Sequence, residues 1–202
     1  MAMVTVTVMV TGIIIITKHK TEMEVTQTPL KGLLVIQPKV FQDERGYFYE
    51  PYNKKVFAGL GITDDFQQDN QSMSQTGVLR GLHFQNPPFA QSKLVRVIQG
   101  SVWDVAVDIR KNSPTYGEHF GLELSEKNKT MLYIPEGFAH GFKTLENDTV
   151  FLYKCSRLYN KASEDSIYWN DPDLHIKWNI ENPVLSEKDK NGKLFKDFKS
   201  QF

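Results

Sequence analysis

Residues 78–96 read VLRGLHFQNPPFAQSKLVR, and the rest of the chain is best interpreted outward from this stretch. Apolar and polar residues alternate on both sides of a Pro-Pro loop, which predicts two extended segments because successive strand side chains face opposite ways. The stretch carries Arg80, His83 and Lys93. A neutral histidine accepts a proton, a lysine stabilises an oxyanion and an arginine binds phosphate. Their combination in one short stretch indicates a site that performs chemistry.

Short β-rich runs continue on both sides of this stretch, from residue 25 onward. Turn signals such as Gly100 and Asn112-Ser113-Pro114 separate them. Only residues 53–59 and a stretch near the C-terminus have a helical pattern. Many short strands at this spacing predict an all-β sandwich or barrel. The runs lie at residues 33–36, 94–98, 102–109, 120–124, 131–134 and 150–155.

Composition limits the classes of function. The chain has 202 residues, with 24 basic and 24 acidic side chains and one cysteine. This length fits one ordinary domain. Balanced charge provides no global field to attract nucleic acid or an anionic membrane, so neither is expected as a partner. The single Cys155 excludes an internal disulfide and fits the reducing cytoplasm.

Residues 1–22, MAMVTVTVMVTGIIIITKHKTE, differ from the rest of the chain. They lack the charged start and cleavage site of a signal peptide, and the apolar run is too short to span a bilayer. β-Branched residues alternate up to Thr11-Gly12, which could turn the chain back on itself. We therefore predict an appended β-hairpin that contacts another subunit, followed by a single domain over residues 23–202.

Several familiar sites have no counterpart in this sequence. It has no glycine-rich phosphate loop, no GxSxG nucleophile motif and no paired cysteines at zinc spacing. None of the five histidines lies two, three or four residues from another. The sequence therefore predicts no metal site built from neighbouring histidines on a strand or helix.

Motifs along the chain resemble those of the dTDP-4-dehydrorhamnose 3,5-epimerase family of sugar-nucleotide epimerases. They occur in family order between about residues 24 and 195: VLRGLHFQ, QSKLVRVIQGSVWDVAVDIRKNSPTYG, YIPEGFAHGF, FLYKC, WNDPDL and LSEKD. The resemblance implies a cupin-type jelly roll, or double-stranded β-helix, with a few short helices. It also implies a homodimer with exchanged N-terminal strands, and neither cofactor nor metal. The implied substrate is a thymidine diphosphate sugar, a 4-keto-6-deoxyhexose inverted at C3 and C5 on the way to L-rhamnose.

Epimerisation next to a ketone requires proton removal on one face, an enolate, and proton return on the other face. His83 is the candidate base and Lys93 the candidate enolate stabiliser. The FLYKC match makes Tyr153 the candidate acid on the opposite face. The base needs a carboxylate partner, which the resemblance places at Asp189 of LSEKD, with Asp171 of WNDPDL as the alternative.

The same resemblance implies a set of substrate-binding residues. Cations would bind the diphosphate, and aromatic and polar side chains would hold the sugar and the base, with Tyr159 as the stacking partner of thymine. The expected cations are Arg45, Arg80 and Lys188, and the other expected residues are Phe48, Glu50, Gln68, Asn70, His140, Tyr159 and Glu164.

Three alternatives stay open at this point. Enzymes that invert only one centre, or that isomerise the keto group, share the fold and much of this residue set. A non-catalytic jelly roll that binds a sugar nucleotide would not need His83, Lys93 and Tyr153 together. A metal-dependent cupin would need clustered histidine ligands, which the spacing does not provide.

Overall fold

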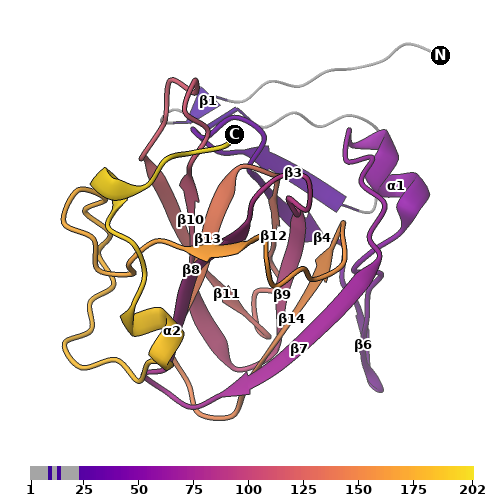
Figure 1. Cartoon of the computed structure of the whole chain (residues 1–202). Coiled ribbons are helices and arrows are strands. Elements are labelled where there is room, and N and C mark those ends of the chain that lie inside the picture. The colour runs from indigo at the N-terminus through magenta and orange to yellow at the C-terminus, as the bar shows by residue number, and fades with distance from the viewer. Residues whose placement is uncertain (1–8, 11–12, 15–22) are drawn as a thin grey trace.

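The structure is a computed structural model that describes residues 9–10, 13–14 and 23–202. In these residues the chain forms two large antiparallel sheets, with short helices and loops around them (Figure 1). One sheet has six strands in the order β3-β4-β12-β9-β14-β7. Its strands are β3 Met23–Gln27, β4 Leu34–Pro38, β7 Gln68–Ser74, β9 Lys93–Gln99, β12 Met131–Ile134 and β14 Thr149–Cys155.

The other large sheet has five strands in the order β11-β10-β13-β8-β15. From β7 to β15 the chain passes repeatedly between the two sheets, so apart from β10 and β11 the neighbouring strands of each sheet in this part are separated in sequence by strands of the other. This is the arrangement of a two-sheet Greek-key or jelly-roll fold. The strands are β8 Leu79–Gln85, β10 Ser101–Asp108, β11 His119–Ser125, β13 Phe138–Thr144 and β15 Glu164–Ser166.

The main core lies between the inner faces of the sheets. The rings of Phe142 on β13 and Phe151 on β14 stack with their centroids 4.3 Å apart, which joins one sheet to the other. Removing a buried phenyl ring of this kind typically costs about 3–5 kcal/mol. The six-stranded sheet and the five-stranded sheet both contribute to this cluster: Val95, Val97, Leu132, Ile134 and Phe151 from the first, and Val102, Ala106, Leu124, Phe138 and Phe142 from the second.

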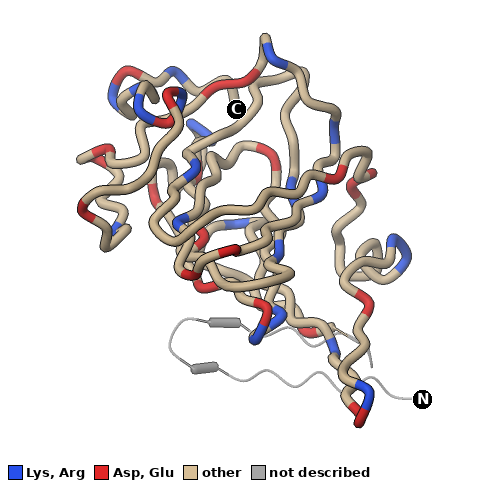
Figure 2. Tube along the Cα trace, turned by 90° about the horizontal axis from the view of Figure 1, so that it is seen from below, with Lys and Arg blue, Asp and Glu red and all other residues tan. Residues whose placement is uncertain are grey.

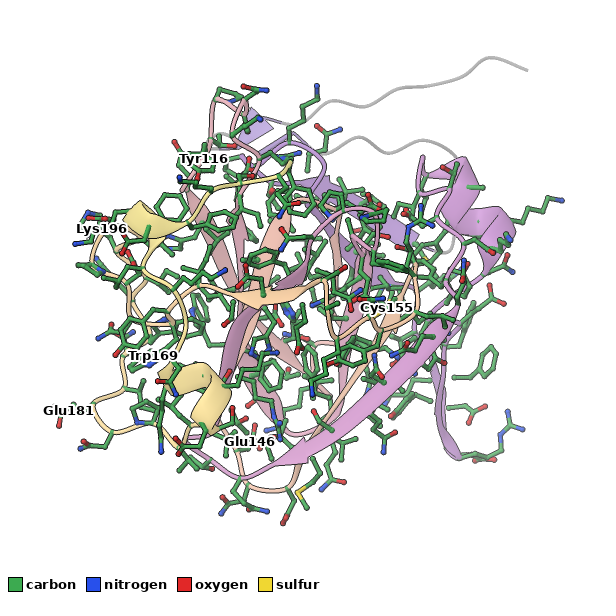
Figure 3. All side chains as sticks on the ribbon, in the orientation of Figure 1. Tyr116, Glu146, Cys155, Trp169, Glu181 and Lys196 are labelled. Carbon is green, nitrogen blue, oxygen red and sulfur yellow. The ribbon has the colours of Figure 1, made fainter. Side chains whose placement is uncertain are left out.

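A second core lies between the five-stranded sheet and the C-terminal segment. Phe198 of that segment packs against Phe84 of β8 at a centroid separation of 5.3 Å. Trp169, labelled in Figure 3, belongs to the same cluster and accepts a hydrogen bond on its carbonyl from the indole of Trp178. The segment therefore packs on the sheet as part of the domain.

Short elements complete the fold. The hairpin of β5 (Phe41–Asp43) and β6 (Gly46–Phe48) projects from the body, and α1 (Lys54–Gly59) follows it (Figure 1). Near the C-terminus lie α2 (Glu187–Lys190) and a turn of 3-10 helix at Phe195–Asp197.

Most of the predicted strands are confirmed, within a residue or two at each end. β7 escaped prediction because its sequence, QDNQSMS, is polar, and β13 because FAHGFKT has no alternating pattern. The predicted hairpin of residues 1–22 lies largely outside the described residues. Of it, the structure gives β1 (Met9–Val10) paired antiparallel with β2 (Ile13–Ile14), and the proposed domain division stays a prediction.

Acidic and basic residues are interspersed along the trace (Figure 2). Nowhere in the described part of the chain is there a helix both long and apolar enough to span a membrane.

Candidate active site

A cavity of about 320 Å³ opens at one end of the two sheets. Three of the four predicted catalytic residues, His83, Lys93 and Tyr153, line it together. His83 lies on β8 of the five-stranded sheet, and Lys93 and Tyr153 lie on β9 and β14 of the six-stranded sheet. The other lining residues are Gln68, Asn70, Phe84, Gln85, Gln91, Tyr159 and Glu164.

Strand register places Lys93 and Tyr153 on one wall. β14 pairs with β9 so that Tyr153 is opposite Val95, two residues along from Lys93. Because side chains two apart on a strand share a face, Lys93 and Tyr153 both point inward. The Lys93 ammonium lies 5.9 Å from the centroid of the Tyr153 ring.

His83 reaches the cavity through a close approach of β8 and β13. A Cβ added at Gly81 would lie 2.6 Å from the Cα of Gly141, and Gly81 has a φ of +141°. Only glycine fits both conditions. Beyond this point His83 pairs with His140 across the two strands.

Asp189 lies directly behind His83. Its Oδ1 is 2.7 Å from His83 Nε2 and also accepts a hydrogen bond from the Gly81 backbone N–H at 3.1 Å. Its Oδ2 accepts the Ser186 hydroxyl at 2.6 Å and, as part of the capping box of α2, the Ser186 backbone N–H at 3.4 Å. Burial raises the pKa of Asp189, but the contacts with His83, Ser186 and Gly81 outweigh burial and lower it to about 2. The carboxylate is therefore charged at neutral pH.

Asp171, the alternative carboxylate, has a different role. Its oxygens accept the backbone N–H groups of Asp173 at 2.9 Å and Phe195 at 2.7 Å. It therefore holds a turn and the C-terminal segment, and Asp189 is the carboxylate in contact with His83.

Burial lowers the pKa of His83, while the contact with Asp189 raises it and the charges of Lys188 and Lys93 lower it further. The net shift is downward, so the imidazole is neutral at cellular pH. Nε2 is shielded from solvent, and its close contact with Asp189 Oδ1 is an ion-pair contact without hydrogen-bond geometry; 28% of the side chain is exposed. The exposed part of the ring therefore comprises its other atoms, and Asp189 favours the tautomer with its proton on Nε2. Nδ1 is then the nitrogen that can accept a proton.

Burial also shifts the pKa values of Lys93 and Tyr153, the two residues on the opposite wall. It lowers the pKa of Lys93, an effect that Cys155 and Asp104 partly oppose. Burial raises the pKa of Tyr153, so the phenol keeps its proton at neutral pH. The cavity thus combines a neutral base, a lysine with a lowered pKa and a protonated phenol.

A second histidine–aspartate pair lies next to the first. His140 Nε2 lies 2.9 Å from the Oδ2 and 3.0 Å from the Oδ1 of Asp104, and both residues are buried. His140 was predicted to bind substrate. It lies beside His83 on the neighbouring strand, facing the same side of the sheet; its Nε2 is engaged by Asp104, and its direct contact with substrate stays a prediction.

The predicted binding residues of the cavity form one connected network. Gln68 donates to Asn70 Oδ1 at 2.9 Å and accepts the Tyr159 backbone N–H at 2.9 Å. The Tyr159 hydroxyl donates to Glu164 Oε2 at 3.1 Å, and Glu164 Oε1 forms an ion pair with Lys188. These five residues come from β7, β15, α2 and the loop after β14.

Arg80 lies outside the residues that line the cavity. It is exposed, and its guanidinium donates to Ser74 Oγ at 3.1 and 3.2 Å. The charge of Arg80 lowers the pKa of Tyr153, although burial, the larger effect, raises it. Arg80 therefore lies near the wall of the cavity that carries Tyr153.

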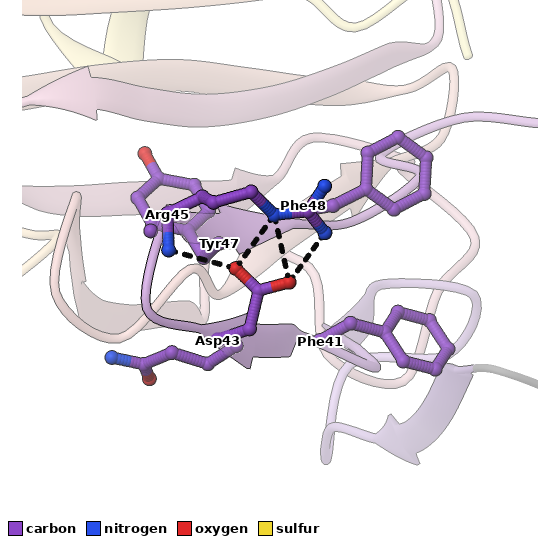
Figure 4. Close-up of a pocket in the computed structure, with 7 residues that line it drawn as sticks. Phe41, Asp43, Arg45, Tyr47 and Phe48 are labelled. Carbon is purple, nitrogen blue, oxygen red and sulfur yellow. Dashed lines mark hydrogen bonds and ion pairs between the residues drawn. The ribbon is translucent and has the colours of Figure 1, made fainter.

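Three further predicted binding residues lie on or next to the β5–β6 hairpin, away from this cavity. Arg45 and Phe48 lie on the β5–β6 hairpin and line a separate hollow of about 540 Å³, and Glu50 follows them. Figure 4 shows Arg45 turned back onto Asp43, to which its Nε donates at 3.1 Å. Phe48 is 69% exposed.

Sequence reasoning missed several residues that shape the site. Asp104 was detectable as a charged residue inside the apolar run SVWDVAVD, since a carboxylate buried in such a strand needs a partner. Gln85, Gln91 and Ser74 gave no signal, because isolated glutamines and serines are common on surface strands.

The structure also bears on metal binding. In residues 9–10, 13–14 and 23–202, no group of three or more His, Cys, Asp or Glu side chains is arranged to hold a metal ion. Metal independence stays a prediction.

With this geometry in place, the chain can be compared with known proteins. The family model for dTDP-4-dehydrorhamnose 3,5-epimerase matches residues 27–197. The chain belongs to this family. A relative of that name from Shigella flexneri is 52% identical over 176 residues, which cover 87% of this chain and 97% of the relative. Membership makes the chain an enzyme of the isomerase class.

Solved structures of the family confirm the predicted cupin-type jelly roll. The crystal structure of the enzyme from Elizabethkingia anophelis matches with a TM-score of 0.84 at 54% identity, covering 88% of this chain and 98% of that chain. The Legionella pneumophila enzyme, in complex with dTDP-4-keto-L-rhamnose, matches with a TM-score of 0.84 at 49% identity, covering 88% and 95%.

Proposed function

We propose that this enzyme inverts C3 and C5 of dTDP-4-dehydro-6-deoxy-D-glucose to give dTDP-4-dehydro-L-rhamnose, in the cytoplasm and without a metal or cofactor. One observation carries the proposal: a base, a cation and a phenol, His83, Lys93 and Tyr153, line a single cavity, with Asp189 2.7 Å behind the base. The names of its relatives support the same reaction.

The first step is removal of a proton next to the ketone. The C4 carbonyl acidifies the C–H bonds at C3 and C5, and Nδ1 of neutral His83 accepts the proton. The C–H electron pair forms the C=C bond of the enolate and the carbonyl pair moves onto O4. Asp189 stabilises the imidazolium that results, because it is charged and lies against Nε2.

The second step returns a proton to the same carbon from the other face. Lys93 stabilises the charge on O4 while the enolate exists. Tyr153 then donates its phenolic proton to carbon, O4 becomes a ketone again, and the configuration is inverted. The phenolate and the imidazolium return to their starting states by exchange with water.

Binding would fall to the polar network at the cavity mouth. Tyr159 is exposed enough to stack on the thymine ring. Lys188 carries a positive charge beside it, and Arg80 adds a second charge for the diphosphate. Either cation must then exchange an existing partner, Glu164 or Ser74, for a phosphate oxygen.

We further propose a homodimer with exchanged N-terminal strands, in which the β5–β6 hairpin completes the partner's site. Phe41, Tyr47 and Phe48 on this hairpin are 44%, 56% and 69% exposed. Exposed aromatic side chains gathered on one projecting element are typical of an interface. In the dimer, Arg45 and Phe48 would serve the substrate of the other subunit.

Proton NMR in deuterated water tests the proposal. The purified enzyme with dTDP-4-dehydro-6-deoxy-D-glucose should exchange both H3 and H5 and accumulate the L-rhamno product. Exchange at one carbon would identify a mono-epimerase. Tight binding without exchange at either carbon would identify a binding protein and contradict the proposal.

A further inference from the structure

The backbone beside the stacking residue is held at three consecutive positions by two glutamine side chains. Gln85 Oε1 accepts the Asn160 N–H at 2.7 Å, and Gln85 Nε2 donates to the Leu158 carbonyl at 3.4 Å. Between these two, the Tyr159 N–H donates to Gln68 Oε1 at 2.9 Å. The backbone of the loop that carries Tyr159 is therefore held by Gln85 and Gln68, whatever the Tyr159 ring contacts.

Gln85 also binds the loop on the other side of the cavity mouth. Its Nε2 donates to the Phe89 carbonyl at 2.7 Å, so one buried amide joins residues 86–92 to residues 156–163. Gln85 is 5% exposed. It lies two residues after His83 on β8, so its side chain faces the same way as the base.

Further hydrogen bonds join the two loops around this amide. The Asn86 N–H donates to the Ser163 carbonyl at 2.7 Å, and Gln91 Nε2 donates to the Arg157 carbonyl at 2.7 Å. Gln85 differs from these contacts because it is buried and bonds both loops at once. Its amide supplies a donor and an acceptor, which no apolar side chain of similar length can replace.

We propose that Gln85 is a positioning residue for the nucleotide end of the substrate: it holds the Tyr159 loop in its binding conformation before the ligand arrives. This inference rests on the proposed function, in which Tyr159 stacks on the base. A loop that is already ordered loses less conformational entropy on binding. Gln85 therefore acts on affinity and leaves proton transfer to His83, Lys93 and Tyr153.

The test uses Gln85→Met, which keeps the length of the side chain and removes both hydrogen-bonding groups. Thymidine diphosphate, which has no reactive sugar, is the binding probe in titration calorimetry. Its affinity should fall about tenfold, as expected when one or two oriented hydrogen bonds are lost. KM should rise by a similar factor while kcat stays within about threefold of the parent value. Gln99→Met, at an exposed glutamine of β9, is the matched control and should leave both unchanged.

Combining Gln85→Met with Tyr159→Ala distinguishes a positioning role of Gln85 from general destabilisation of the protein. In Tyr159→Ala the stacking group is absent, so adding Gln85→Met should weaken thymidine diphosphate binding less than twofold further. An equal loss in both backgrounds, or a fall in kcat at constant KM, would overturn the proposal. Absence of turnover in the parent enzyme would instead overturn the proposed function, because thymidine diphosphate binding is measured separately.

The parent enzyme gives an independent reading if Gln85→Met does not fold. The amides of Tyr159 and Asn160 should exchange slowly with deuterium in the free enzyme and change little when thymidine diphosphate binds. Fast exchange that slows only in the complex would show that the ligand orders the loop, and Gln85 would have no positioning role.

Discussion

Replacing Asp189 with asparagine removes the charge behind His83 while keeping the shape of the side chain. The amide oxygen can still accept the Gly81 N–H, and the Ser186 hydroxyl can rotate to accept from the new amide. The fold gives up only the acceptor of the Ser186 backbone N–H, a 3.4 Å bond of the α2 capping box. What is lost is the stabilisation of the imidazolium that forms when His83 takes a proton. The substitution therefore acts on the chemical step.

Two arguments give the size of the effect. The pKa of Asp189 falls from 3.8 to about 2, and the contact with His83 is the largest of the effects that lower it; the whole shift corresponds to about 2 kcal/mol. Opposite unit charges about 4 Å apart in a partly buried site interact with about 4 kcal/mol. A loss of about 2 to 4 kcal/mol predicts a fall in kcat of roughly 30-fold to 1000-fold.

The assay is deuterium exchange at H3 and H5, with thymidine diphosphate affinity measured in parallel. Affinity should stay within about threefold, because Asp189 lies behind His83. The acid limb of the rate profile should also move to lower pH, since removing Asp189 takes away a group that raises the pKa of His83. Asp171→Asn, which changes a buried carboxylate with no contact to His83, is the control. Parent-like exchange in Asp189→Asn, or a larger loss in Asp171→Asn, would refute the dyad.

Four further predictions follow from the same geometry. Lys93→Met should raise the activation barrier by about 2.7 to 4 kcal/mol, the range for a lost oxyanion donor. In the parent enzyme, the alkaline limb of the pH–rate profile should lie below 10.5, because burial lowers the pKa of Lys93. If Lys93→Arg left this alkaline limb in place, the limb would not report Lys93. Tyr153→Phe should still bind substrate and exchange deuterium but lose net inversion, and normal product formation would show that another group donates the proton. Dialysis against EDTA should leave kcat unchanged, whereas recovery with one specific divalent ion would show a metal enzyme. Burial raises the pKa of Asp108, but hydrogen bonds from Arg110, Ser113 and Thr115 outweigh burial and hold this pKa at about 2. Asp108 should therefore contribute about 2 kcal/mol to the free energy of unfolding at neutral pH, and this contribution should be lost as pH falls from about 4 to 2. Urea unfolding of Asp108→Asn should lack this acid dependence.

The fold was predictable where a strand had the apolar or alternating sequence pattern typical of a buried strand. The buried strands β9, β10, β12 and β14 are continuous apolar or alternating runs, and turn residues mark their ends. β7 was not predictable in this way. Gln68 and Asn70 on one face line the cavity, and the residues of the other face are exposed at the edge of the sheet, so neither face shows a buried apolar pattern.

The catalytic candidates were predictable for a related reason. His83 and Lys93 lie close together in sequence on two strands of opposite sheets that face each other, so a local pattern carried the information. The positions of Asp189 and Tyr153 came from family resemblance alone. No local rule could place them beside His83, because their proximity arises from the packing of strands and of the C-terminal segment.

The route that brings Asp189 to His83 makes catalysis depend on packing far from the cavity. Asp189 is 108 residues from Gly81, whose N–H it accepts, and it sits on a segment fixed on both sides by contacts outside the site. Before it, Val184 pairs with Val78; after it, Lys193 pairs with Ile167. The aromatic cluster of Phe84 and Phe198 then holds the end of the segment against β8. Because His83 takes its tautomer and charge stabilisation from Asp189, loosening this segment removes the dyad even where the two sheets and the rest of the cavity remain folded.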